Sequence, residues 1–315
     1  MSLEKNIGRR LSIKRTYKAP FFIKGTVVLA VLMLLGNGVS YLIGFGQPPL
    51  VLLHEEIEYY LMPNMSYKRF GNEISINQYS MRSVQFDRDN KNPLYTVMGD
   101  SVVYGEHQID QKQTIAYILN SQLKEKYGDD SIVVASIAAS SWGPGNMLAF
   151  YEEMGPFPGK TVFLILSSHD RSDVPFMTTG RVPYKTDIPR TPLHDLVTSV
   201  NSKIMEKLKT PEIAMSYGQR HALSKGSLIS LIDRLKTDYA QVALVFHATR
   251  KEVFNDGGGE SYYRGVAKDN DIQFLSTVLA YRDLYNADIP VHRDNIHLTW
   301  QGNQRLSETL LQLIP

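Results

Sequence analysis

An uncharged stretch near the N-terminus constrains this chain more than any other feature. No Asp, Glu, Lys or Arg occurs from Gly25 to Leu53, and the run TVVLAVLMLLGNGVSYLIGF inside it has about the 20 residues needed to cross a hydrocarbon layer. A buried core helix and a cleaved signal peptide would also be apolar. The run is, however, longer than the roughly 7–15 residues of a signal-peptide core, and no small-x-small cleavage site follows it. The sequence therefore predicts an uncleaved transmembrane helix at 25–46.

Charge is distributed unevenly on the two sides of this helix. Residues 1–53 hold seven of the 34 Lys and Arg residues and one of the 32 acidic residues, which leaves residues 54–315 with a net charge of −4. Positively charged flanks stay in the cytoplasm, so we expect one crossing of the cytoplasmic (inner) membrane with the N-terminus inside. The acidic remainder argues against nucleic acid as a partner. The chain has no cysteine, which excludes disulfides and thiol catalysis and is compatible with an exported domain.

The regions flanking the helix differ in composition. Residues 1–24 form a basic arm expected in the cytoplasm. The segment Gln47-Pro48-Pro49 ends or kinks the spanning helix, and we expect a juxtamembrane linker at 47–76 with a short helix at Leu50–Leu61. The remaining residues, 77–315, are then one globular domain on the periplasmic or extracellular side.

Within that domain, short apolar runs alternate with segments of helical periodicity. Strands are expected from Leu94 and at 132–135, 161–166, 241–246 and 272–275, and helices at 113–127, 147–154, 193–208, 222–238, 261–270 and 299–313. Strands that alternate with helices predict a parallel sheet covered on both faces. A long loop is expected at 171–192, and loops of this length are often functional.

Two short motifs carry the candidate chemistry. Ser101 follows the first buried strand directly after Gly99 and Asp100, so it lies at the carboxyl edge of the sheet, where open α/β sheets bind ligands. Near the other end of the chain, Asp294 precedes His297 by three residues. An acid at this spacing can orient an imidazole, which can in turn deprotonate a serine hydroxyl. Each motif alone has an ordinary structural explanation as a turn or a helix start, whereas together they predict Ser101, Asp294 and His297 as catalytic residues.

In these motifs the chain resembles the SGNH (GDSL-type) hydrolase superfamily, from about Asn77 to the C-terminus. The resemblance implies a flavodoxin-like three-layer α/β/α fold with about five parallel strands, and no cofactor. The segment Asn77–Arg82 is also similar to an Asn-x-x-Gly-x-Arg segment of membrane-anchored members, except that Ser80 replaces the glycine. A surface loop is the alternative interpretation of that segment.

The resemblance also implies oxyanion donors, and here the chain departs from the family. Ser141 stands where the family has a glycine, with Gly143 as the alternative position, and His169 stands where it has an asparagine. A backbone N–H remains available at Ser141, and a histidine can donate a hydrogen bond. Further candidates for substrate contact, each with a structural alternative, are Trp142, Asp170, His247 and Arg250.

Two clusters of His and Asp residues are the candidates for a metal site. His292, Asp294 and His297 are closely spaced, and His169, Asp170 and Asp173 form a second cluster. The first cluster, His-x-Asp-x-x-His, lacks the i, i+4 spacing of a helical zinc motif, and no cysteine contributes, so we expect no metal.

These observations predict a membrane-anchored serine esterase or O-acyltransferase. By resemblance its substrates are acyl groups, acetyl above all, on exopolysaccharide or cell-envelope glycan, in a setting that includes a polysaccharide-synthesis complex. The alternative is a catalytically reduced glycan-binding or assembly module of a polysaccharide export system, motivated by the missing glycine and asparagine. A third interpretation is a thioesterase or lipase acting on membrane lipids, with the loop at 171–192 as a lid.

Overall fold

A five-stranded parallel sheet organises the protein in the computed structural model, which describes residues 19–89, 93–175, 185–208, 215–255 and 257–314. The strands, in sheet order, are β6 (Val133–Ala138), β5 (Leu94–Gly99), β7 (Gly159–Leu166), β8 (Tyr239–Phe246) and β9 (Gln273–Ser276). In chain order this is 2-1-3-4-5, the flavodoxin-like order. The predicted fold class is confirmed.

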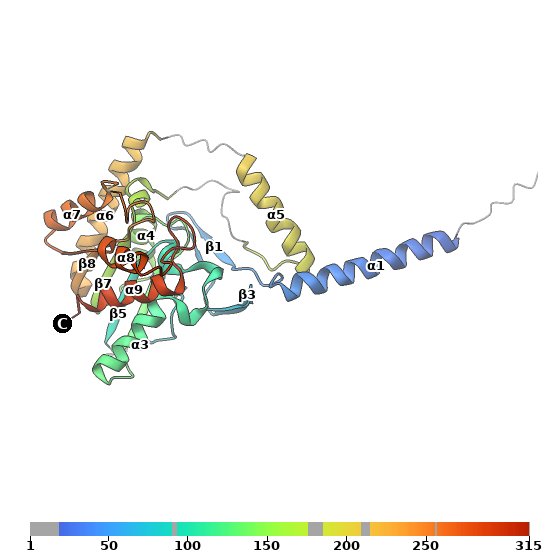
Figure 1. The fold of residues 1–315 in the computed structure, drawn as a ribbon, viewed down its shortest axis with the longest axis horizontal. Coiled ribbons are helices and arrows are strands. Elements are labelled where there is room, and N and C mark those ends of the chain that lie inside the picture. Colours follow the sequence, from blue (N-terminus) through green and yellow to red (C-terminus); the bar gives the residue numbers. More distant parts are fainter. Residues whose placement is uncertain (1–18, 90–92, 176–184, 209–214, 256, 315) are drawn as a thin grey trace, which may run out of the picture.

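Helices cover the two faces of the sheet (Figure 1). On one side α3 (Ile115–Tyr127) packs against α9 (Trp300–Leu311), which also contacts α8 (Val278–Asn286); on the other, α4 (Pro144–Met154) packs against α6 (Tyr217–Asp238), and α7 (Gly259–Asp269) contacts β8 and β9. Every residue of β5 and β6 is buried. Strands buried on both faces are continuously apolar, which is why these runs were recognisable in the sequence.

The segment before the sheet is folded into two antiparallel hairpins. One joins β1 (Val51–His54) to β2 (Glu58–Leu61), and the other joins β3 (Met65–Arg69) to β4 (Asn72–Ile76). The helix predicted at Leu50–Leu61 is therefore wrong. Residues alternate between buried and partly exposed along β2, the period of a strand with one face on a core. Buried residues of both hairpins belong to the same core as the sheet, so the expected linker at 47–76 packs on the domain.

Helix α1 (Ala19–Leu42) projects from the domain (Figure 1). Its segment Ile23–Leu42 has 20 residues and a mean hydropathy of 1.8, and only 6% of its apolar stretch is buried within the protein. That length and composition suit a membrane span and a signal sequence alike. The basic arm expected at 1–24 lies largely outside the described residues.

Helix α5 (Pro192–Leu208) contacts α1. It follows the loop expected at 171–192, of which residues 176–184 lie outside the described part of the chain. The loop begins as a 3₁₀ helix, η3 (Ser168–Ser172), and Lys185 pairs with Leu50 in an isolated parallel bridge.

Candidate active site

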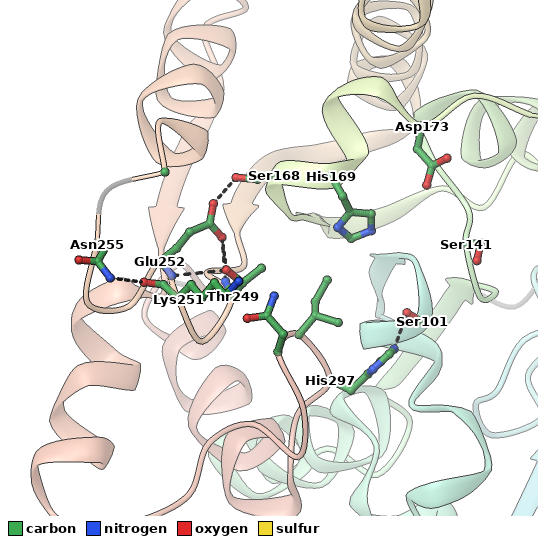
Figure 2. Close-up of a pocket in the computed structure, with 13 residues that line it drawn as sticks. Ser101, Ser141, Ser168, His169, Asp173, Thr249, Lys251, Glu252, Asn255 and His297 are labelled. Atoms are coloured by element: carbon green, nitrogen blue, oxygen red, sulfur yellow. Dashed lines mark hydrogen bonds between the residues drawn. The ribbon is translucent and has the colours of Figure 1, made fainter. Parts of the chain in front are cut away.

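Ser101, His297 and Asp294 are joined by hydrogen bonds. Ser101 begins the short helix α2 (Ser101–Tyr104) at the carboxyl end of β5, and the other two lie on the loop between α8 and α9. His297 Nε2 lies 2.9 Å from Ser101 Oγ (Figure 2). His297 Nδ1 lies 2.7 Å from Asp294 Oδ2. Because Nδ1 faces a carboxylate it carries the ring proton, and Nε2 is left to accept the hydroxyl proton of Ser101.

The turn into α2 depends on a glycine at the end of β5. A Cβ on Gly99 would lie 2.6 Å from Val103 Cγ2 and 2.8 Å from Ile165 O, closer than side chains can pack. The following Asp100 caps α2 by accepting a hydrogen bond from Val102 N at 2.8 Å. In the Gly-Asp-Ser motif, Gly99 therefore allows the close packing of the turn, and Asp100 caps the helix that follows it.

Asp294 is held as an anion. Its Oδ1 accepts hydrogen bonds from the backbone N–H groups of Ile296 and His297, both at 2.8 Å. Burial raises the pKa of this carboxyl, but these two donors and the His297 ring outweigh it and lower the pKa to about 2. Asp294 is therefore charged at neutral pH and can orient and stabilise a protonated His297.

His169 lies on η3 and faces the Ser101–His297 pair across the site (Figure 2). Its Nε2 is 3.0 Å from Asp100 Oδ2 and 3.3 Å from Asp170 Oδ1. Both oxygens are buried and have no partner besides this imidazole within the described part of the chain, so the imidazole is the group that compensates their burial. Burial lowers the pKa of His169, but Asp170, Asp100 and Asp173 outweigh it and raise the pKa to about 10. His169 is therefore a cation at neutral pH.

The acids around His169 are not all ionised. Asp100 has a pKa below its usual value because its contact with His169 outweighs the effect of burial. Burial raises the pKa of Asp170 well above its usual value and that of Asp173 to about 6.

Asp100, His169 and Asp170 are also the residues that could hold a metal ion. One ligand atom from each lies within 4.8 Å of the others. A metal would have to displace the proton of His169, whose pKa of about 10 weakens binding at neutral pH. His292 does not join such a group: its Nδ1 is 2.9 Å from the Tyr285 hydroxyl and its Nε2 3.0 Å from Ala248 O.

Ser141 borders the site with a backbone conformation that glycine adopts more readily. Its φ is +59°, in the left-handed region. Its N–H has no acceptor among the described residues, whereas the N–H of Gly143 donates to Asn146 Oδ1 at 2.9 Å. Of the two predicted positions, only Ser141 therefore has a free donor.

A pocket of about 660 Å³ opens around these residues, within the size range of ligand sites. Ser101, Ser141, His169 and His297 line it (Figure 2). Its far wall is the loop after β8, with Thr249, Lys251, Glu252 and Asn255, together with Asn295 beside Asp294. In this loop the sequence pointed only to Arg250, and none of these lining residues was predicted. The only signal for this wall was the position of residues 249–255 after the fourth strand, at the same edge of the sheet as Ser101.

The other predicted contact residues differ in their access to the pocket. Arg250 is exposed and borders a second hollow next to Asp294. Asp170 is fully buried behind His169. Trp142 is 1% exposed, and its Nε1 donates to Tyr59 O at 3.0 Å. The indole therefore has no open face on which a sugar ring could stack.

His247 is also fully buried, under the loop that carries Asp294 and His297. Its Nε2 donates to Ile296 O at 2.8 Å, and its Nδ1 is 2.9 Å from the Tyr281 hydroxyl. Burial lowers the pKa of His247 to about 3, so the ring is neutral. It supports the loop and does not reach the pocket.

The segment Asn77–Arg82 supports the nucleophile from the other side. Asn77 and Arg82 are buried, and Ser80 has a φ of +62°, again a left-handed conformation that glycine adopts more readily. Arg82 donates to Tyr104 O at 3.0 Å and to Ile109 O at 2.5 Å, in the loop that follows Ser101. The segment is therefore largely buried and hydrogen-bonded to the residues that follow Ser101, and it is not a surface loop.

The chain was compared with known proteins. No protein-family model matches it, and no curated protein does. Similar solved structures include a member of the lipolytic protein G-D-S-L family from Veillonella parvula DSM 2008, at 11% identity over 70% of this chain and 97% of that one, with a TM-score of 0.44. A catalytic mutant of Axe2, an acetylxylan esterase from Geobacillus stearothermophilus, gives 13% identity over 72% and 95%, with a TM-score of 0.46. TesA gives 15% identity over 70% and 96%, with a TM-score of 0.44. Likenesses this distant do not establish an activity.

Proposed function

We propose that this protein is a serine ester hydrolase or O-acyltransferase that works through an acyl-enzyme on Ser101. The observation that carries the proposal is the continuous hydrogen-bonded series from Ser101 through His297 to Asp294. His297 takes the serine proton as the hydroxyl attacks the acyl carbonyl, and then returns it to the leaving alcohol. Water or a second hydroxyl, activated by the same imidazole, releases the acyl group.

The oxyanion of the tetrahedral intermediate would lie between Ser101, Ser141 and His169. The free N–H of Ser141 is one donor, and the imidazolium of His169 supplies a fixed positive charge. A charged donor stabilises a developing oxyanion more strongly than a neutral one. The replacement of asparagine by histidine is thus compatible with activity, because the ionised Asp100 beside it favours the protonated histidine.

The wider setting is inferred from the side chains of the pocket wall and from α1. We infer an acylated, preferably acetylated, glycan as substrate, because the pocket wall offers Lys251 and Asn255 to sugar hydroxyls, while Glu252 accepts from Ser168 and Thr249. We further infer that α1 is a membrane span that holds the domain outside the cytoplasmic membrane, since Ile23–Leu42 is almost wholly exposed and apolar and is preceded by the basic arm.

The test uses the full-length protein in detergent or nanodiscs. A fluorophosphonate probe should label the parent protein and the control Ser121→Ala, which removes an exposed hydroxyl on α3. Labelling should disappear in Ser101→Ala and His297→Ala. Hydrolysis of p-nitrophenyl acetate should fall by about 10³-fold or more in both variants, and release of acetate from an acetylated glycan should fall with it.

Two other outcomes of this experiment would lead to different conclusions. A parent protein that is folded but neither labelled nor active would contradict the serine mechanism and favour the glycan-binding module. Labelling without hydrolysis would favour an acyltransferase, which acetyl transfer to an added glycan acceptor would then test.

A further inference from the structure

One face of α5 is apolar and open. Leu193, Val197, Val200 and Ile204 follow each other at i, i+4, i+7 and i+11, the spacing of a single helix face. Val197 is 58% exposed, Val200 48% and Ile204 52%. In the described part of the chain, no segment covers these three side chains, which we call the α5 stripe together with Leu193.

The opposite face of α5 is attached to the domain. Asp195 Oδ2 accepts from Arg69 Nη1 and from Gly46 N, both at 2.8 Å, and Lys185 Nζ is 2.5 Å from Asp195 Oδ1. Burial raises the pKa of Asp195, but these three donors outweigh it and lower the pKa to about 2. The charged contacts fix the rotation of α5 about its own axis, so the direction in which the stripe faces is set by the fold.

The first residue of the α5 stripe, Leu193, contacts α1. A side chain at Gly36 would meet Leu193 Cδ2 at 3.3 Å, and Leu193 N donates to Asn37 Oδ1 at 3.1 Å. This contact also gives a partner to Asn37, a polar residue inside the apolar run. Gly36 lies six residues before the end of α1 at Leu42, which corresponds to a depth of about 9 Å along the helix. From this contact α5 runs off to one side of α1 (Figure 1).

We propose that the α5 stripe lies in the outer interfacial layer of the membrane that α1 crosses, with lipid acyl chains as its occupant. The proposal rests on the proposed membrane span. Amphipathic helices bury their apolar face about 5–10 Å into the boundary between headgroups and acyl chains, and the contact between Leu193 and α1 lies at that depth. The polar face, with Asp195, is then turned toward the domain and away from the lipid.

The absence of cysteine in the chain makes the test direct, because a single introduced cysteine is the only site for a thiol-reactive dye. Full-length protein is reconstituted in vesicles of phosphatidylcholine and phosphatidylglycerol and labelled with an environment-sensitive fluorophore. The positions are Val200→Cys on the stripe, Ser202→Cys on the opposite face and Leu29→Cys in the middle of α1. All three parent residues are exposed in the structure. Nitroxide-bearing lipids quench dyes in the bilayer, and iodide quenches dyes in water.

The proposal expects Val200→Cys to lose fluorescence with lipids that carry the nitroxide near the headgroup and to resist iodide, with the reverse pattern for Ser202→Cys. Quenching of Val200→Cys by iodide while Leu29→Cys remains in lipid would overturn the proposal and leave the membrane span intact. Protection of Val200→Cys from both quenchers would also overturn it, in favour of a protein partner or a second copy of the chain. Quenching of Leu29→Cys by iodide would overturn the span, and the stripe proposal with it.

Discussion

His247 holds the carbonyl oxygen of Ile296 at 2.8 Å from its Nε2 and thereby ties the loop of Asp294 and His297 to the end of β8. The backbone N–H of Arg250 donates to Asn295 O at 2.7 Å in the same loop. The position of His297 relative to Ser101 thus depends on a buried histidine that never meets the pocket.

Replacement of His247 by Phe should lower both stability and activity. It leaves the buried Ile296 carbonyl without its donor, at a cost of about 1–3 kcal/mol, and removes one partner of the Tyr281 hydroxyl. The loss of activity should fall mainly on kcat, because His297 is misplaced relative to Ser101 while Thr249, Lys251 and Asn255 of the pocket wall are kept. His247→Gln, which keeps a donor, should recover part of both in urea unfolding and steady-state kinetics. Equal kcat in all three proteins would exclude this positioning role.

Acid should destabilise the domain through the same residue. His247 and His292 have folded-state pKa values of about 3 and about 4, because burial disfavours their charged forms. An unfolded histidine titrates near pH ~6.5, so below that pH the unfolded state binds more protons and stability falls as the pH drops. The slope of unfolding free energy against pH between 6 and 4.5 should be smaller in His247→Gln. An unchanged slope would show that His247 is charged in the folded protein.

Replacement of Asp294 by Asn should nearly abolish turnover. The amide cannot hold the Nδ1–H tautomer of His297 as the carboxylate does, nor stabilise its cation, and comparable changes cost about 10²–10⁴ in kcat. The matched control is Asp269→Asn, an exposed acid at the end of α7, which should keep parental activity. A loss below about tenfold for Asp294→Asn would mean that another group orients the imidazole.

Activity should decline at alkaline pH through His169. Its folded-state pKa of about 10 lies above the ordinary value, so its ion pairs contribute fully below pH ~6.5 and are lost as the pH rises toward 10. Rates measured from pH 8 to 10.5 should fall as the cation is lost. His169→Ala should be slower at pH 8 by roughly 10²–10³-fold, as for loss of an oxyanion donor, and should lack this alkaline decline. An identical decline in both proteins would assign it to another group.

Glycine should be favoured at the two serines with left-handed backbone. A left-handed conformation costs an L-residue about 1–2 kcal/mol. Glycine avoids this cost but loses more conformational entropy on folding, which offsets roughly half of the gain. Ser80→Gly and Ser141→Gly should each raise the free energy of unfolding by up to about 1 kcal/mol, and Ser141→Gly should stay active because its N–H is kept. Ser121→Gly, in the middle of a regular helix, should instead lower stability. Loss of stability in all three would contradict the argument.

The parts of this structure that were predictable carry strong local patterns. The buried strands and the helix α3 could be read from continuous and periodic apolar residues, and the Gly-Asp-Ser and Asp-x-x-His motifs from their place in chain order. The Ser101–His297 hydrogen bond agrees in geometry with that prediction, while its catalytic role stays a prediction until measured.

The parts that escaped prediction depend on partners distant in sequence. Residues 50–61 have helix-compatible composition, and only packing on the sheet makes them a hairpin. Trp142 lies beside the site in sequence but is turned inward by Tyr59, which a single segment cannot reveal. His247 gave no sign that it would bond to Ile296, 49 residues away.

The first hairpin, β1–β2, has a mechanical consequence. It starts shortly after α1 ends, and it is bonded directly to the loop of Ser141: Tyr59 through Trp142, and Ile57 through Asn146 Nδ2 at 2.9 Å. The connection from α1 to the residues around Ser141 is therefore a folded hairpin bonded to the domain, and it is not a flexible linker. If α1 is the proposed membrane span, Ser101 lies at one fixed height above the lipid surface, and a polymeric form of the proposed glycan substrate would have to move past that height for each of its acyl groups to be reached.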